Sequence, residues 1–390
     1  MDKKIRHIYF LSFLFTLHIA LSAYINSTFL TNIISENSVG LLYTGSSLLT
    51  LILLAKSSSI LKYMGNRKLT IFFLFVNMIS LLGLVTSTIP LVIATSFVIF
   101  MTTNTLVLFC IDIFIEHFSD QEKTGETRGL YLTIVNIGYM VSPLIAAFLI
   151  TKGGGYKAIY MLAFILMVIM TIFLIFSVKT FQDKIYIKQP FLQTYKYLLC
   201  KKNMLSIVIV NFLLQFFFAW MVIYTPIYLY NHIGFNWDQI GIIFTIMLIP
   251  FVILGLPIGL IIDKYKVSKV KLLNIGFIII IIFTSLIAFI YTKNIIVWGV
   301  ILFMTRIGAS IIETTSEIYF FENITDKDTH LLSVYRDMYP VAYIIAPLLA
   351  TVILFFVPFN NYLFLILGFI MLSGFYYIPK IKNEYLSCEN

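Results

Sequence analysis

The chain has 390 residues, of which 60% are hydrophobic and only 12% are charged. A typical soluble domain is about 25% charged, so this chain has too little polar surface to cover a water-soluble globule of its size. Most of it must therefore lie in lipid. The net charge of +9 does not indicate nucleic-acid binding, because the basic residues form no patch interleaved with aromatic residues.

The three cysteines, Cys110, Cys200 and Cys388, are scattered along the chain without a CxxC spacing. They fit neither a disulfide framework nor a zinc site. No histidine-rich or acidic cluster suggests a metal either, so we expect no metal centre.

A membrane-spanning helix needs about 20 mostly apolar residues, and the sequence contains twelve such stretches. In chain order they are approximately 8–31, 39–61, 69–88, 90–114, 129–151, 156–178, 204–230, 239–262, 270–291, 295–320, 331–357 and 360–379. The first follows a basic start like that of a signal peptide, but it is too long for one, so we expect it to be retained. The sequence thus predicts an all-α integral membrane protein.

Lysine and arginine are concentrated in the loops on one side of the predicted membrane. With the N-terminus in the cytoplasm, 23 of the 27 basic residues fall on the cytoplasmic side. External loops carry only Lys152, Lys157 and Lys293, and Arg306 lies inside a span. Because cytoplasmic loops are enriched in Lys and Arg, both termini are predicted to be cytoplasmic, in the plasma (inner) membrane of a prokaryote.

The longest polar stretch, 179–203, follows the sixth span. It divides the chain into a six-helix bundle at 1–178 and a second one at 204–390. A cytoplasmic linker is the simplest interpretation, and a short amphipathic helix on the inner membrane surface is the alternative.

One sequence motif occurs in both halves of the chain. Residues 131–147 read YLTIVNIGYMVSPLIAA and residues 335–351 read YRDMYPVAYIIAPLLAT, with both tyrosines, the proline and the small residues in register. Phe100–Thr102 likewise matches Phe303–Thr305. The halves are therefore parallel repeats, and transporters built this way hold substrate near mid-membrane, between the halves.

Small residues in this repeated motif recur at four-residue spacing. One strip contains Gly138, Ser142 and Ala146 beside Pro143, and the other contains Ala342, Ala346 and Ala350 beside Pro347. Small residues let membrane helices approach closely, and proline removes one helical hydrogen bond and permits a bend. Simple helix packing, without any transport, is the alternative explanation.

With this organisation the chain resembles the major facilitator superfamily of secondary transporters. The resemblance extends to the loops after spans 2 and 8, where the family has Gly-x-x-x-Asp-Arg-x-Gly-Arg-Arg. After span 8, Gly259 and Asp263 keep their positions in GLIIDKYKVSK; after span 2, Gly65 keeps its position in SSILKYMGNRK, but Lys62 replaces the acid. The strip in span 5 is similar to the family's glycine–proline pattern of exporters, so export is slightly favoured over import.

Span 10 carries three charged residues, Arg306, Glu313 and Glu317, at spacings that place them on one helical face. Charged residues inside a membrane cost about 2.5–3.5 kcal/mol on insertion scales, so they usually have a function or a partner. The resemblance implies that helices 1, 4, 7 and 10 line a central cavity. The stripe there is a candidate for substrate binding (Arg306) and proton coupling (Glu313), and a static ion pair is the alternative.

Other charged residues lie near the cytoplasmic ends of spans and are candidates for an inner gate. Glu317 and Arg336 form one group, and Asp112, Glu116 and Arg128 form another. The resemblance implies a contact of Asp263 with Arg128. We also hypothesise a swapped pair of Lys62 with Asp337.

Uncharged polar residues mark two further predicted cavity helices. Span 1 carries His18 and Asn26, and span 7 carries Asn211, Gln215, Trp220 and Tyr224. Such side chains recognise substrates through hydrogen bonds and aromatic faces. Hydrogen bonding between helices is the alternative, and His18 as a proton relay is a further one.

Together these features predict a secondary active transporter for a small molecule, working as a monomer and coupled to an ion gradient, with protons expected. No GxxxxGK[ST] motif occurs, so neither ATP nor another cofactor is expected. A membrane enzyme, a channel and a transporter-like sensor remain alternatives. The enzyme is disfavoured because the five histidines are dispersed, and the channel because twelve spans in two similar halves favour alternating access.

Overall fold

The computed structural model describes residues 3–118, 124–177, 198–199, 201–323, 329–356 and 361–381. These residues form helices and short turns, and no strand occurs among them. Helices suit a chain in lipid because each one bonds its own backbone N–H and C=O groups where no water is present to do so.

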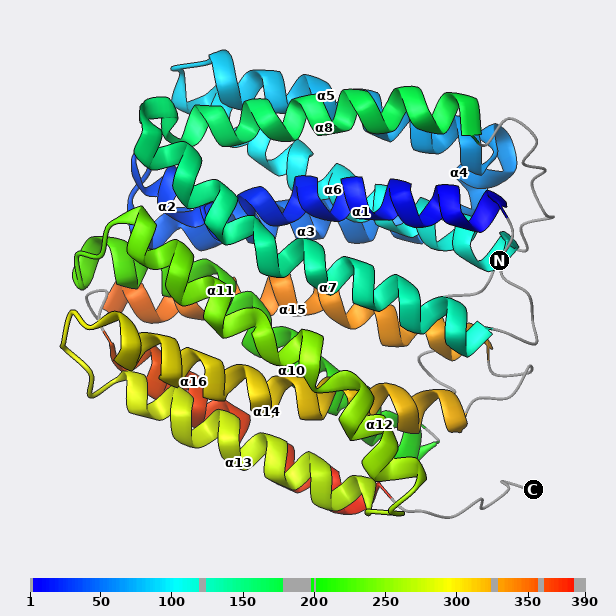
Figure 1. The fold of residues 1–390 in the computed structure, drawn as a ribbon, viewed down its shortest axis with the longest axis vertical. Helices are drawn as coiled ribbons and strands as arrows, with labels where there is room; N and C mark the ends of the chain where they lie inside the picture. Colours follow the sequence, from blue (N-terminus) through cyan, green and yellow to red (C-terminus); the bar gives the residue numbers. More distant parts are fainter. Residues whose placement is uncertain are drawn as a thin grey trace. The chain divides into compact units, whose positions relative to one another are not determined.

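Figure 1 shows the helices coloured in chain order, from blue at the N-terminus to red at the C-terminus. Those of the first half are α1 (Lys3–Ala23), α2 (Asn26–Thr31), η1 (Glu36–Ser38), α3 (Val39–Ala55), α4 (Ser57–Met64), α5 (Asn66–Thr86), α6 (Pro90–Phe118), α7 (Thr124–Leu149), η3 (Ile150–Gly154) and α8 (Gly155–Ser177). Those of the second half are α10 (Lys202–Ile227), η4 (Tyr228–His232), α11 (Trp237–Ile253), α12 (Gly255–Asp263), α13 (Lys269–Ile287), α14 (Ile295–Glu322), α15 (Thr329–Phe356), α16 (Tyr362–Met371), α17 (Gly374–Tyr377) and η6 (Ile378–Lys380).

Eleven runs of the described residues are long and apolar enough to cross a membrane. One of them, Ile134–Ser177, has 44 residues, about twice the length of a single span. It contains α7 and α8, between which the chain turns at Gly153 (φ +89°) and Gly155 (φ +58°). The described residues therefore provide twelve spanning segments, and the predicted architecture is confirmed.

Several spans are interrupted where the sequence predicts one continuous helix. The first breaks at Tyr24 and Ile25, between α1 and α2. The second ends at Ala55, earlier than the predicted residue 61, and the exposed Lys56 separates it from α4. The eighth is divided into α11 and α12 at Leu254. Gly65, at the end of α4, has φ +74°, a conformation that glycine adopts without a steric penalty.

The described chain forms two compact units. Unit 1 comprises Met1–Lys188, Val222–Thr245 and Pro347–Val357. Within it α1 packs against α6, α7 and α8, and α5 packs against α6 and α8, as Figure 1 shows for α5 and α8. The helix α3 packs against α6.

Unit 2 comprises Gln189–Met221, Ile246–Ala346 and Pro358–Asn390. Here α13 packs against α14 and α16, and α12 packs against α14. Glycine allows α13 and α14 to approach closely: a Cβ atom on Gly308 would lie 2.6 Å from the carbonyl oxygen of Gly276. Such close approach of small residues is how helices associate in lipid.

The compact units do not follow the two halves of the sequence, because unit 1 includes 222–245 and 347–357 from the second half. The division into bundles at 1–178 and 204–390 stays a prediction. Most of the predicted linker, 179–203, lies outside the described residues.

Candidate functional site

Arg306 is enclosed by aromatic rings in the middle of α14. Its side chain is 2% exposed, and its guanidinium carbon lies 5.2 Å from the ring centre of Phe217 and 5.6 Å from that of Phe218. Both phenylalanines belong to α10, within unit 2. A cation over aromatic faces is stabilised by the ring quadrupoles, more so when water is excluded. These contacts explain how the sequence retains an arginine inside a span.

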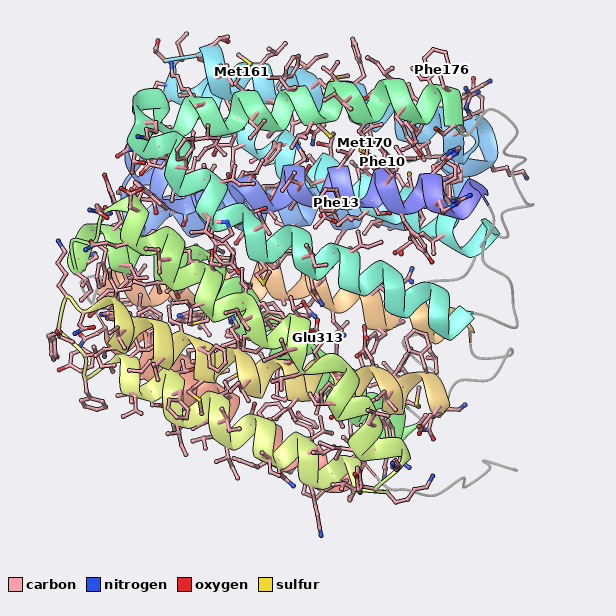
Figure 2. The ribbon with its side chains drawn as sticks, viewed as in Figure 1. Phe10, Phe13, Met161, Met170, Phe176 and Glu313 are labelled. Atoms are coloured by element: carbon pink, nitrogen blue, oxygen red, sulfur yellow. The ribbon has the colours of Figure 1, made fainter. Side chains whose placement is uncertain are left out.

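The two glutamates of the stripe lie further along α14, as Figure 2 shows for the position of Glu313. Glu313 interacts electrostatically with both Glu317 and Arg306. Seven residues of helix rise by about 10 Å, so Glu313 and Arg306 are neighbours rather than a hydrogen-bonded pair. The stripe predicted from the spacing is thus present as a set of interacting charges along one helix.

A chain of hydrogen bonds connects the stripe to α10 and α15. The hydroxyl of Ser316 donates to the carbonyl of Glu313 (3.0 Å) and lies 3.2 Å from the hydroxyl of Tyr335. The Tyr335 ring stacks on Phe320 with centroids 4.1 Å apart. Asn211 donates from Nδ2 to the Tyr335 carbonyl (2.9 Å). These hydrogen bonds connect the backbone of α14 at Glu313 to two further helices of unit 2.

Two more residues predicted on span 7 are placed by these contacts. Gln215 donates from Nε2 to Asn211 Oδ1 (3.4 Å), and the Trp220 ring lies 5.6 Å from that of Phe216. Tyr224, which belongs to unit 1, donates to the Pro347 carbonyl (3.3 Å). That carbonyl belongs to α15, so this hydrogen bond joins the end of α10 to α15.

Unit 1 contains a separate polar network centred on His18 of α1. His18 is completely buried, with Nδ1 3.1 Å from the Ala163 carbonyl of α8 and Nε2 3.2 Å from Asn104 Oδ1 of α6. Asn77 of α5 donates from Nδ2 to the same Asn104 oxygen (2.8 Å) and to Thr103 Oγ1 (2.8 Å). Four helices are joined by this network.

Asn26 accepts a hydrogen bond in the same unit. The Tyr160 hydroxyl donates to Asn26 Oδ1 at 2.8 Å, and both side chains are buried. The polar residues predicted on span 1 thus bond to neighbouring helices. This is the pattern expected of residues that hold helices together.

The residues of both small-residue strips are buried. Ser142 donates to the Gly138 carbonyl (2.7 Å), and a Cβ atom on Gly138 would lie 3.0 Å from Thr16 of α1. On α15, Ala342, Ala346 and Ala350 are fully buried, and Pro347 is buried beside them. The first strip packs α7 against α1, as the packing explanation requires.

The inner-gate candidates are only partly described. The side chains of Glu116, Arg128 and Asp263 lie outside the described residues, so the predicted contact of Asp263 with Arg128 stays a prediction. Asp112, Arg336, Asp337 and Glu317 are half-buried, and Lys62 is exposed. Gly259, within α12, has open space around it. Because Lys62 and Asp337 belong to different units, their pairing also stays a hypothesis.

Sequence reasoning missed Asn77, Asn104 and Glu36. Both asparagines are buried in otherwise apolar spans, and this isolation is a signal that could have singled them out. Glu36 bonds to Asn231, 195 residues away, and no local pattern indicates such a contact.

The fold and these buried polar groups define a polytopic α-helical membrane protein with charged and hydrogen-bonding side chains inside its spans. A family model described as Major Facilitator Superfamily matches residues 8–336. The chain belongs to this family. The predicted resemblance is therefore confirmed, and the family points to a transporter rather than an enzyme.

Two solved structures are similar in fold. One is the crystal structure of a mutant of the nucleoside transporter NupG, with a TM-score of 0.73 and 13% identity, covering 97% of this chain and 100% of that one. The other is an auto-inhibited peptide transporter of the POT family, with a TM-score of 0.76 and 10% identity, covering 99% and 98%. A search of curated protein sequences finds no match.

Proposed function

We propose that this protein is a secondary active transporter that moves a small molecule across the plasma membrane by alternating access. It works as a monomer with both termini in the cytoplasm. Transport is coupled to an ion gradient, with protons as the expected ion and export as the favoured direction. Membership of the family and the two transporter-like folds support this class of protein.

The observation that carries the proposal is the charged stripe of α14 around the buried Arg306. Arg306 is 2% exposed over two phenylalanine rings, and Glu313 interacts with it on the same helix. A buried arginine binds carboxylate, phosphate or hydroxyl groups through its planar fork of donors, which suits an anionic or polyhydroxylated substrate. The surrounding rings suit an aromatic or hydrophobic solute equally. A library of solutes used to test the site must therefore contain both classes.

The first experiment measures the melting temperature of detergent-purified protein across such a library. Arg306→Ala removes the guanidinium, Arg306→Lys keeps the charge without the fork, and Lys293→Ala removes an exposed loop cation as the matched control. A solute that stabilises the wild type and Lys293→Ala, but not Arg306→Ala, supports a site at Arg306. Stabilisation retained in Arg306→Ala contradicts this role and moves the binding site to the polar residues of α1 and α10.

The second experiment tests coupling with that solute in proteoliposomes. An imposed pH gradient should drive accumulation in the wild type. Glu313→Gln, which cannot carry a proton at this position, should exchange solute across the membrane without responding to the gradient. If the solute binds but is not transported by the wild type, the protein is a sensor and the proposed function is wrong.

A further inference from the structure

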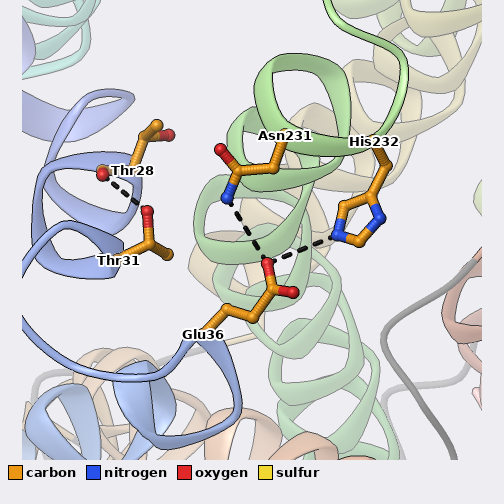
Figure 3. Close-up of polar contacts among 5 residues, drawn as sticks. All are labelled: Thr28, Thr31, Glu36, Asn231 and His232. Carbon is orange, nitrogen blue, oxygen red and sulfur yellow. Dashed lines mark hydrogen bonds and ion pairs between the residues drawn. The ribbon is translucent and has the colours of Figure 1, made fainter.

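Glu36 connects the segment after the first span to the end of the seventh. It lies on η1, and its Oε2 accepts a hydrogen bond from Asn231 Nδ2 (3.4 Å) and lies 3.3 Å from His232 Nε2, as Figure 3 shows. The Glu36 and His232 side chains are 30% and 29% exposed. All three residues belong to unit 1. The contact is therefore partly open to the solvent and joins the two halves of the sequence.

Local structure holds both sides of this contact in place. His232 ends the π-helical turn η4, and its ring stacks on that of Tyr228 with centroids 5.9 Å apart. On the other side, the Thr31 hydroxyl donates to the Thr28 carbonyl (2.8 Å) at the end of α2, shortly before Glu36. Fixed backbones on both sides reduce the entropy lost when the side chains meet.

More deeply buried contacts join the same parts of the chain. Trp237 donates from Nε1 to the Tyr156 hydroxyl (3.1 Å), and the Tyr24 and Phe244 rings lie 4.9 Å apart. A Cβ atom on Gly40 would lie 2.7 Å from the Pro347 carbonyl oxygen. Together these contacts form a layer, defined as residues 222–245 and 347–356 packed on the first half of the sequence. In the predicted topology this layer lies at the external ends of the helices.

We propose that Glu36, Asn231 and His232 form an external latch that holds this layer closed, and that protonation of His232 tightens the latch. The inference rests on the alternating access of the proposed function, because a layer that never opens needs no latch.

The direction of the pH effect follows from the partners. Two titratable groups contact His232: Glu36 of η1, and Tyr228, which begins the same turn η4. A neutral imidazole gives the carboxylate one ordinary hydrogen bond, whereas an imidazolium gives it a charge-assisted one, which is about twice as strong. The latch is therefore tightest while His232 is an imidazolium and Glu36 a carboxylate, and it loosens when the imidazole loses its proton as the external pH rises.

Thiol labelling from outside tests the latch without any substrate. Thr351→Cys, in a background with the three native cysteines replaced, places a thiol at a position that is 1% exposed and faces Gly40. A membrane-impermeant methanethiosulfonate reaches it only when the layer opens. Lys152→Cys, in an exposed loop, is the control that reports the reagent's own pH dependence.

We expect the labelling rate at 351, divided by that at 152, to be about two- to five-fold lower at pH 5.5 than at pH 8, the range for a partly exposed ion pair. His232→Asn and Glu36→Gln should remove this pH dependence, and His232→Arg should keep labelling slow at both pH values. His7→Asn, on α1 beside Phe173, is the matched control and should behave as the wild type. A ratio that is independent of pH in the wild type, or unchanged in His232→Asn, overturns the proposal.

Thermal unfolding gives a second measurement, which decides the case if 351 is never labelled. His232→Asn should lower the melting temperature at pH 5.5 more than at pH 8, and an equal loss at both values contradicts the latch. Neither measurement uses a transported solute. Labelling that depends on pH in a protein that transports nothing would overturn the transport of a solute, while the opening of the layer and the latch that controls it would stand.

Discussion

The contact between α13 and α14 makes a quantitative prediction, because it depends on the absence of two side chains. A Cβ atom on Gly308 would lie 2.6 Å from the Gly276 carbonyl oxygen and 3.0 Å from the Ile280 backbone nitrogen. Ordinary contacts begin at about 3.4 Å, so Gly308→Ala must separate the two helices by several tenths of an ångström. Backbone atoms cannot rotate away as a flexible side chain could.

We place the steric cost of Gly308→Ala at the upper end of the range of about 1–3 kcal/mol for insertions into well-packed cores, because two of the close atoms belong to the backbone. Alanine also favours helix by about 1 kcal/mol over glycine, which offsets part of that cost. Gly45→Ala is the matched control, because nothing lies within 4 Å of its Cβ position on α3. Only the helix-propensity term applies there, so the two substitutions should change stability in opposite directions.

Thermal unfolding of purified protein in one detergent measures both variants. We expect the melting temperature to fall by roughly 2–5 °C in Gly308→Ala and to rise slightly in Gly45→Ala. Gly276→Ala, whose Cβ would lie 2.9 Å from the Gly308 carbonyl oxygen, should behave like Gly308→Ala. The double variant should lose less than the sum, because one separation of the helices accommodates both methyl groups. An unchanged or raised melting temperature in Gly308→Ala would refute the reasoning.

Three further substitutions test hydrogen bonds by thermal unfolding. Asn294→Ala removes the side chain that accepts from the first backbone N–H groups of α14 and should cost about 1 kcal/mol, whereas Asn294→Asp should retain the cap. Asn77→Leu removes the donor to Asn104 and should cost about 0.6–2 kcal/mol, the range for hydrogen bonds between membrane helices. Tyr160→Phe leaves Asn26 without the hydroxyl that it accepts from and should cost a similar amount. No loss in a variant would show that its bond has no net effect on stability.

The spans and the charged stripe could be predicted from sequence because both are properties of single helices. The length of an apolar run gives a span, and the spacing of Arg306, Glu313 and Glu317 gives a common face. The predicted spans hold over the described residues, and α14 carries all three charged residues. The breaks at Tyr24 and Leu254 were not predicted. Neither proline nor glycine marks the first, and the second lies between Pro250 and Pro257, residues that membrane helices also accommodate without a break.

Partners on other helices could not be predicted. Periodicity tells which face of α1 carries His18, but it does not tell that α6 brings Asn104 to that face and α5 brings Asn77 to Asn104. The contact of Glu36 with His232 joins residues 196 positions apart. Such pairs depend on how all the helices assemble, and a single sequence does not record that assembly.

The glycine turn between α7 and α8 has a practical consequence. Residues 151–154 are exposed, and Gly153 has open space around its Cβ position. Exposed tips of small residues tolerate inserted peptides, so an epitope inserted after Gly153 should leave both helices intact. An antibody that binds such an epitope on intact cells would show that this turn faces outward. Five spans precede the turn, so the N-terminus would then lie inside. With twelve spans in all, the C-terminus would lie on the same side.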